Sequence, residues 1–91
     1  MDIENFDDVI KNIPKSSEIF VDKSMEILDR IHFLFEKSGW TQKELADKLG
    51  KKEEWVSRSL YGLQNFTLRT ISELEAIFGE EIISVYKSNT Q

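Results

Sequence analysis

The stretch TQKELADKLGKKEEWVSRSLYG, residues 41–62, decides the fold of this chain. Its first half carries leucine and alanine at helical spacing and ends on Gly50, which is typical of a short helix. Its second half repeats the design, with Val56 and Leu60 one helical turn apart and Gly62 as a stop. The pattern therefore predicts two short helices joined by a tight turn.

The junctions of this stretch carry the residues that such a pair of helices needs. Thr41 is followed three residues later by Glu44, the spacing of a capping box at a helix start. Ala46 is small where two helices must approach closely, and Gly50 permits a sharp turn. With a longer helix before it and another after it, the pair is laid out as a helix-turn-helix.

The rest of the chain predicts an all-α domain of five helices. Apolar residues spaced by three and four over residues 3–13 indicate a short amphipathic helix that Pro14 ends. A long helix follows, with Ser16 or Ser17 as its cap and Gly39 as its stop. We expect its inward stripe to comprise Val21, Met25, Leu28, Ile31, Leu34 and Phe35.

The last predicted helix begins at Thr67 as its cap and carries Leu68, Ile71 and Leu74 as its apolar stripe. The tail segment EEIISVYK is rich in β-branched residues, which favours an edge strand or a short helical turn. We divide the chain into an N-terminal helical arm at residues 1–20, a helix-turn-helix domain at residues 21–79, and a tail at residues 80–91 that is a candidate dimerisation segment.

Composition and charge narrow the possible partners. The chain has 91 residues, no cysteine and a net charge of −5, and it lacks an apolar run long enough to span a membrane, so we expect a cytoplasmic protein without membrane contact. Counting charges gives −4 for residues 1–39, +2 for residues 40–70 and −3 for residues 71–91. Only the middle third is basic, which argues against indiscriminate binding to nucleic acids but permits one basic surface.

The segment at residues 40–79 resembles the phage-repressor-like helix-turn-helix family, also called the XRE family. The blocks TQKELA, WVSRSL and NFTLRTI, in that order, are similar to those of HigA-type antitoxins and related regulators. The resemblance implies a domain that binds double-stranded DNA. It also implies that Gln42 contacts a phosphate, and it supports the same role for Lys43, Asn65, Thr67 and Arg69.

Helical geometry selects the residues that would read bases. With the direction of Val56 taken as the core, Glu54, Arg58 and Tyr61 lie roughly 140–200° away, and Ser57 and Trp55 flank them at about 100°. Arg58 is suited to guanine, and Tyr61 and Trp55 to thymine methyl groups or the sugar-phosphate wall. Ser57 suits a base edge or a phosphate, and Glu54 either accepts from cytosine or faces water.

The remaining charges of the same region serve other roles. Glu53 is expected to lean toward the protein, where with Glu54 it complements the dipole at the helix start. Lys51 and Lys52, just before the helix, are expected to contact phosphate and to soften the repulsion between Glu54 and the DNA backbone.

The sequence does not contain a group of residues that could catalyse a reaction. His32 is the only histidine, and with Glu36 one turn further on it falls short of the ligand number of a metal site. The serines lack partners placed for a nucleophile, and no glycine-rich phosphate loop is present. We therefore expect no catalytic residues, no metal and no cofactor, and a structural or solvated role for His32.

The sequence thus predicts a sequence-specific regulator of transcription, binding DNA as a homodimer. As a finer hypothesis it is the antitoxin and autorepressor of a toxin–antitoxin pair, with the acidic residues 1–39 suited to a basic toxin. The alternative is a module that binds and neutralises a protein and keeps the helix-turn-helix as a scaffold. Phe33 and Phe35 of the long helix lie about 200° apart, so one packs inward and the other needs a second surface. That surface is the N-terminal helix, a second subunit or a partner protein.

Overall fold

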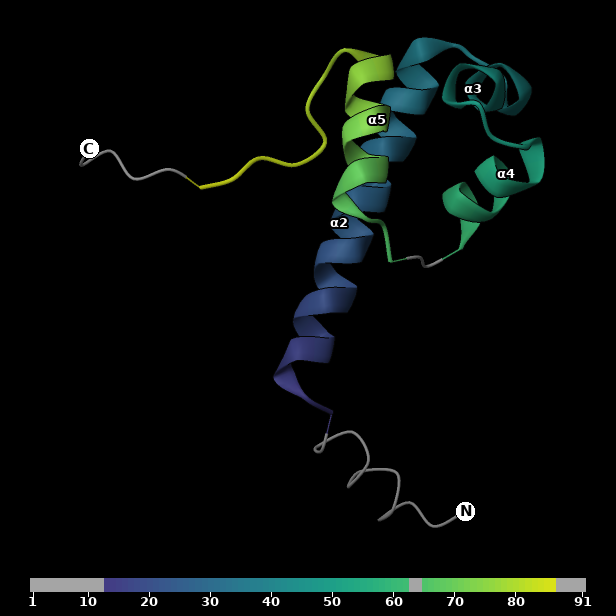
Figure 1. Cartoon of the computed structure of the whole chain (residues 1–91). Coiled ribbons are helices and arrows are strands. Elements are labelled where there is room, and N and C mark those ends of the chain that lie inside the picture. Colours follow the sequence, from purple (N-terminus) through teal and green to yellow (C-terminus); the bar gives the residue numbers. More distant parts are fainter. Residues whose placement is uncertain (1–12, 63–64, 87–91) are drawn as a thin grey trace, which may run out of the picture.

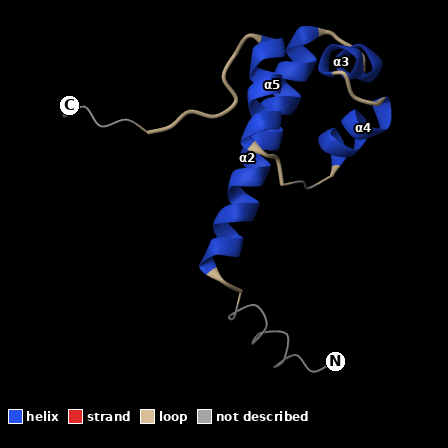
Figure 2. Cartoon of the chain, viewed as in Figure 1, coloured by secondary structure: helices blue, strands red, loops and turns tan. Residues whose placement is uncertain are grey.

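The computed structural model describes residues 13–62 and 65–86, and this part of the chain is built from helices (Figures 1 and 2). In chain order they are α2 (Lys15–Ser38), α3 (Gln42–Leu49), α4 (Glu53–Tyr61) and α5 (Leu68–Phe78). The all-α prediction is confirmed, but five helices are not, because four helices account for the described residues. The helix expected at residues 3–13 falls on residues outside the described part, apart from Ile13. No described helix is long and apolar enough to cross a membrane.

The start of α2 differs from the prediction. Pro14 is its N-cap, with an extended backbone (φ −60°, ψ 144°), and its carbonyl accepts from the backbone N–H groups of Ser17 and Glu18. Neither Ser16 nor Ser17 caps the helix, because both lie inside its first turn. Proline suits this position, since its fixed φ is compatible with helix entry and it has no N–H to leave unsatisfied. The predicted stop is confirmed, because Gly39 adopts the left-handed conformation with φ 73°.

The 24 residues of α2 reach past the other helices (Figure 1). At 1.5 Å per residue α2 is about 36 Å long, whereas the longest helix packed against it has 11 residues. Its C-terminal half carries the buried Ile31 and Leu34, while Val21 and Met25 are 42% and 47% exposed. The sequence-predicted stripe is therefore wrong at its N-terminal end, where no described helix is available to cover it. Phe33 and Phe35 divide as expected, since Phe35 packs against the core and Phe33 is exposed.

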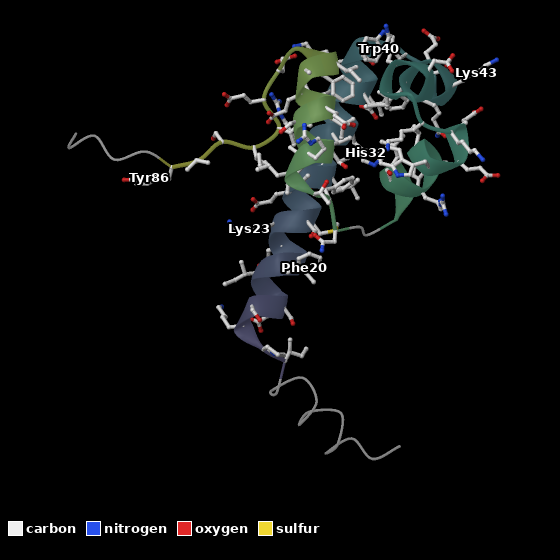
Figure 3. All side chains as sticks on the ribbon, in the orientation of Figure 1. Phe20, Lys23, His32, Trp40, Lys43 and Tyr86 are labelled. Atoms are coloured by element: carbon white, nitrogen blue, oxygen red, sulfur yellow. The ribbon has the colours of Figure 1, made fainter. Side chains whose placement is uncertain are left out.

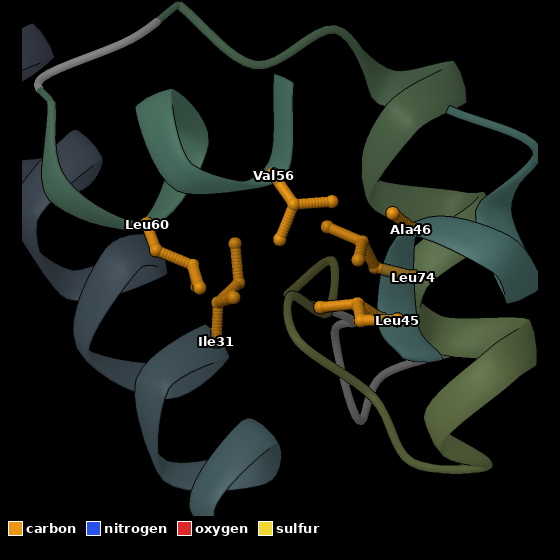
Figure 4. Packing of buried hydrophobic residues seen from close by; sticks show 6 residues of the cluster. All are labelled: Ile31, Leu45, Ala46, Val56, Leu60 and Leu74. Atoms are coloured by element: carbon orange, nitrogen blue, oxygen red, sulfur yellow. The ribbon is translucent and has the colours of Figure 1, made fainter. Parts of the chain in front are cut away.

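The core lies where α3 and α4 meet the C-terminal half of α2 and the face of α5 (Figure 4). One or two side chains from each helix form it, and each is at most 4% exposed. Burying such side chains contributes roughly 1.5–3 kcal/mol for each large residue, which offsets the weak intrinsic stability of short helices. The cluster comprises Ile31, Leu45, Ala46, Val56, Leu60 and Leu74.

Helix α5 closes the bundle beside α2 (Figure 2). The hydroxyl of Thr67 accepts from the backbone N–H of Thr70, which confirms its predicted role as a cap. Ile71 and Leu74 are buried, but Leu68 is 68% exposed and so does not belong to the apolar stripe. Leu68 is the first residue of the helix, and a side chain at that position leans beyond the helix end instead of onto the neighbouring helices.

The predicted C-terminal strand is absent from the described residues, since residues 80–86 follow α5 without pairing to a second strand (Figure 1). The segment is extended, as β-branched residues favour, but a strand also needs a second strand to pair with.

The first part of the segment at residues 80–86 is held by polar contacts. The carboxylate of Glu75 accepts from the backbone N–H groups of Ile82 and Ile83, at 2.8 Å and 3.1 Å. Arg30 donates from Nε to the carbonyl of Glu81, 3.0 Å away.

Glu80 adds a further contact between α2 and the tail. We call the contacts of Glu75, Glu80, Arg30 and Lys37 that hold residues 80–83 the clamp. Its carboxylate accepts from Lys37 Nζ at 2.8 Å and lies 3.8 Å from a guanidinium nitrogen of Arg30. The hydrogen bond from Lys37, aided by the charges of Lys37 and Arg30, lowers the pKa of Glu80 below its ordinary value of 4.5. The hydrogen bonds from Ile82 and Ile83 lower the pKa of Glu75 in the same way.

We predict that this clamp makes the domain lose stability in acid. A carboxyl group whose pKa is lowered by folding stabilises the protein fully above the unfolded value of about 4.5, and the contribution is lost as pH falls through the folded value. The Glu75→Gln/Glu80→Gln variant should therefore show a flatter loss of melting temperature between pH 6 and pH 3, measured by circular dichroism. Glu36→Gln, an exposed carboxylate outside the clamp, is the matched control, and equal slopes for all three proteins would contradict the prediction.

Candidate nucleic-acid interface

The junction between α3 and α4 fixes how the two helices cross. The hydroxyl of Thr41 accepts from the backbone N–H of Glu44, and the Glu44 carboxylate returns a contact to the backbone N–H of Thr41, so the predicted capping box is confirmed. At the other end Gly50 is left-handed with φ 68°. The N–H of Lys51 then reaches the carbonyl of Ala46, and the N–H of Gly50 that of Asp47, which is the hydrogen-bond pattern of a Schellman motif.

Helix α4 has one buried and one exposed face. Val56 and Leu60 are 1% and 2% exposed and point into the core (Figure 4). On the opposite side Glu54 and Arg58 are exposed, and Tyr61 is 69% exposed. The helical-wheel prediction of an outward strip made of these three residues therefore matches the geometry. With nine residues, α4 would be marginal alone, so its buried face holds the exposed strip in place.

The residues that flank the strip are less accessible. Ser57 is half-buried. Trp55 is also half-buried, packs against the core and has Lys51 Nζ 5.4 Å from its ring centre. Glu53, expected to lean inward, is exposed. It is the first residue of α4, and because side chains lean toward the helix N-terminus, its carboxylate extends past the helix end into water.

The C-terminal end of α4 is connected to two other helices. Gln42, the first residue of α3, donates from Nε2 to the hydroxyl of Tyr61, 3.4 Å away. From α2, His32 forms a hydrogen bond with the carbonyl of Leu60, and its ring meets that of Tyr61 edge-on with centroids 5.7 Å apart (Figure 3). Gly62 ends α4. A Cβ at this position would lie 2.9 Å from the carbonyl oxygen of Arg58, so any residue other than glycine would clash with it. Sequence reasoning missed this role of His32, because residues 32 and 61 are far apart in the chain.

The described basic side chains differ in whether they form ion pairs. On α2, Lys15, Arg30 and Lys37 form ion pairs with carboxylates. Around α3 and α4 the cations keep their charge unpaired, and among the described residues none is within ion-pair distance of a carboxylate. Lys48 lies over the ring of Trp40 at 4.6 Å, as Lys51 lies over Trp55. The exposed cations of this surface are Lys43, Lys48, Lys51, Lys52, Arg58 and Arg69.

The other candidates for phosphate contact lie at element boundaries. Lys43 is exposed in the first turn of α3, and Lys52 is the N-cap residue of α4 (Figure 3 labels Lys43). Asn65 and Arg69 are exposed before and at the start of α5. Thr67 is exposed as well, but its hydroxyl is engaged with Thr70. Gln42 is half-buried and engaged with Tyr61, which holds its amide at the junction of α3 and α4.

A bracing helix, a left-handed turn and a second helix with one buried and one exposed face define a helix-turn-helix, the module that presents a helix to the DNA major groove. A family model described as helix-turn-helix matches residues 31–83, more than half of the chain. The protein therefore belongs to the XRE-type helix-turn-helix family of DNA-binding transcription regulators. No curated protein and no solved structure gave a significant match to the chain.

Proposed function

We propose that this protein recognises a specific sequence of double-stranded DNA through α4 and regulates transcription in the cytoplasm. The observation that carries the proposal is the exposed strip of Glu54, Arg58 and Tyr61 on a helix whose other face is buried. A rigid helix that offers a guanidinium, a phenol and a carboxylate on one side has the donors and acceptors that base edges require. The chain-wide charge of −5 supports selective over general binding.

Each member of the strip has a distinct proposed role. Arg58 is the partner for guanine O6 and N7, because the planar guanidinium can donate two parallel N–H bonds to these two acceptors. Tyr61 contacts a thymine methyl group or the groove wall. Glu54 accepts from cytosine N4 or remains in water, and its repulsion from phosphates is reduced by the nearby Lys51 and Lys52. Ser57 and Trp55, half-buried at the border, contribute through the atoms that they expose.

The surrounding cations are proposed to position the helix on the DNA. Lys43, Lys51, Lys52 and Arg69 lack carboxylate partners among the described residues and so remain available for phosphates. We assign Gln42, Asn65 and Thr67 to the same role, with Gln42 supported by its place at the start of α3, where free N–H groups also face outward.

We further propose that the protein binds DNA as a homodimer through its tail, residues 80–91. One nine-residue helix supplies few base contacts, and two half-sites about 34 Å apart would double them. The tail supports this assignment because Val85 and Tyr86 are 81% and 91% exposed, while the clamp at Glu75 and Glu80 fixes where the segment leaves the domain. Large apolar side chains held out in this way favour association with a second apolar surface.

A second candidate function is that of an antitoxin, as the resemblance to HigA-type antitoxins suggests. A specific observation favours a protein partner: the N-terminal half of α2 exposes Phe20, Val21 and Met25, which the DNA-binding function does not use. This surface belongs to the acidic region at residues 1–39, whose charge of −4 suits a basic toxin. The arm at residues 1–20 would then bind the toxin, while α4 binds DNA.

We predict that two substitutions separate base reading from phosphate binding. Arg58→Ala should lower affinity for the cognate duplex by about 1–3 kcal/mol and reduce its preference over a scrambled duplex, with an unchanged melting temperature because Arg58 is exposed. Lys43→Ala is the matched control, an exposed cation that should weaken binding to both duplexes alike and reduce the salt slope by about one unit. Fluorescence anisotropy titrations at several salt concentrations measure both effects. Full selectivity in Arg58→Ala would refute the assigned reading face.

The second prediction concerns the dimer. Val85→Asp/Tyr86→Asp should convert a dimer into monomers in sedimentation velocity and weaken operator binding, because charge replaces the exposed apolar side chains outside the clamp. Ile19→Asp is the control, since Ile19 is 44% exposed on α2 and belongs neither to the tail nor to the residues assigned to DNA. A dimer that persists in the tail variant would move the interface elsewhere, and a monomeric wild type bound to DNA would reject the dimer.

The third prediction tests the antitoxin role. If the adjacent gene encodes a basic toxic protein, co-expression of this chain should restore growth, and deletion of residues 1–13 should abolish rescue while leaving operator affinity intact. Arg58→Ala should behave in the opposite way, with rescue retained and operator selectivity lost. Rescue by the deletion variant would show that the arm is dispensable for the toxin. Loss of operator binding in that variant, with a normal melting temperature, would place the arm on DNA.

A further inference from the structure

His32 makes contacts that neither the core nor the proposed DNA contacts explain. It is half-buried on α2, one residue after the core residue Ile31, yet it is turned toward the end of α4 (Figure 3). A leucine or phenylalanine would fill such a position if packing were all that it required. The imidazole instead forms a hydrogen bond with the carbonyl of Leu60 and presents its ring to Tyr61.

The hydrogen bond satisfies a group that the helix leaves free. The last four carbonyls of an α-helix have no partner within the helix, and the carbonyl of Leu60 is one of these in α4. Leu60 is 2% exposed, so water has little access to its residue. Since a carbonyl only accepts, the Nε2 atom of His32 must carry the proton and donate. His32 thus anchors the final turn of α4 to α2.

The ring contact acts on the next residue, which belongs to the exposed strip. Tyr61 is 69% exposed, but both ends of its side chain are touched. The His32 ring meets its aromatic ring at 5.7 Å and 66°, an edge-to-face arrangement. Its hydroxyl accepts from Gln42 Nε2 at 3.4 Å. A side chain held at two points loses less conformational freedom when it meets a ligand than one that is free to rotate.

We propose that His32 is a positioning residue for sequence recognition: it holds the last turn of α4 and the ring of Tyr61 in the orientation that meets the base pair. His32 does not touch DNA in this scheme and acts through Leu60 and Tyr61. The inference rests on the proposed function, because it requires that Tyr61 contribute to base preference. It identifies α2 as part of the recognition apparatus, in addition to its role in the core.

The test compares base preferences position by position. Duplexes randomised over the operator are selected with the full-length wild type, Tyr61→Ala, Arg58→Ala and His32→Ala, and the selected pools are sequenced. Tyr61→Ala should relax preference at one or two positions, and Arg58→Ala at different ones. His32→Ala should relax preference roughly two- to tenfold at the positions of Tyr61 only. Glu36→Ala, an exposed residue one turn along α2, is the matched control and should leave the whole profile unchanged.

Two conservative variants separate the two contacts of His32. His32→Phe keeps an aromatic edge beside Tyr61 but loses the donor to Leu60, and His32→Gln keeps a donor but loses the ring. Each should relax preference at the Tyr61 positions by less than His32→Ala does. These variants also carry the test if His32→Ala fails to fold. In the Tyr61→Ala background, His32→Phe should cause no further relaxation at those positions, because the residue it positions is gone.

The possible outcomes distinguish this inference from the proposed function. A wild type that selects no sequence refutes the proposed function, and the inference with it. A selective wild type whose preferences at the Tyr61 positions survive His32→Ala, or both conservative changes, refutes the inference alone, even if the melting temperature falls. Uniform relaxation at all positions, or Tyr61→Ala without any effect on preference, would also overturn it.

Discussion

The burial of Val56 and Leu60 against α3 is the interaction on which the rest of this structure depends. An isolated helix of nine residues is marginal in water, so α4 forms because one of its faces is removed from solvent. Ala46, 2% exposed, allows α3 to come close, and Gly50 sets the crossing of the two helices. Once the inward face is fixed, helical geometry leaves Glu54, Arg58 and Tyr61 no place but the outer surface.

Charge is distributed so that one surface keeps its cations free. The carboxylates of Glu18 and Glu80 pair with Lys15, Arg30 and Lys37, all on α2. Pairs of this kind are screened by water, and they cancel positive charge locally. The cations around α3 and α4 have no such partners among the described residues. Residues 40–70 have a net charge of +2 in a chain of −5, and their cations are not cancelled by ion pairs, which favours a selective contact with DNA over general attraction.

The long helix α2 links several parts of the molecule. Its C-terminal half supplies Ile31 to the core, Arg30 and Lys37 to the tail clamp, and His32 to the end of α4. Its N-terminal half extends beyond the other helices with exposed apolar side chains. A change on α2 can therefore affect three parts of the molecule: the packing of α4, the position of the tail, and the ring of Tyr61.

Local sequence determined the elements and their ends. The capping box at Thr41 and the left-handed stops at Gly39 and Gly50 depend on interactions within one helical turn, which the chain encodes directly. The outward direction of Arg58 and Tyr61 followed from the period of the helix once Val56 was taken as buried. The class of protein was indicated separately, by the resemblance of residues 40–79 to the XRE-type helix-turn-helix family.

Tertiary structure decided what depends on contacts between distant residues. Val21 and Met25 have the spacing of core residues but lie where α2 extends beyond the helices packed against it. The spacing of apolar residues in one helix does not indicate how long the other helices are. The tail is rich in β-branched residues, as strands are, but it does not pair with a second strand among the described residues. Contacts of Glu75 and Glu80 hold it against the helices. The sequence around His32 does not indicate its contact with Tyr61, because the two residues meet only in the folded protein. Such pairings are set by how the helices pack, which no local pattern specifies.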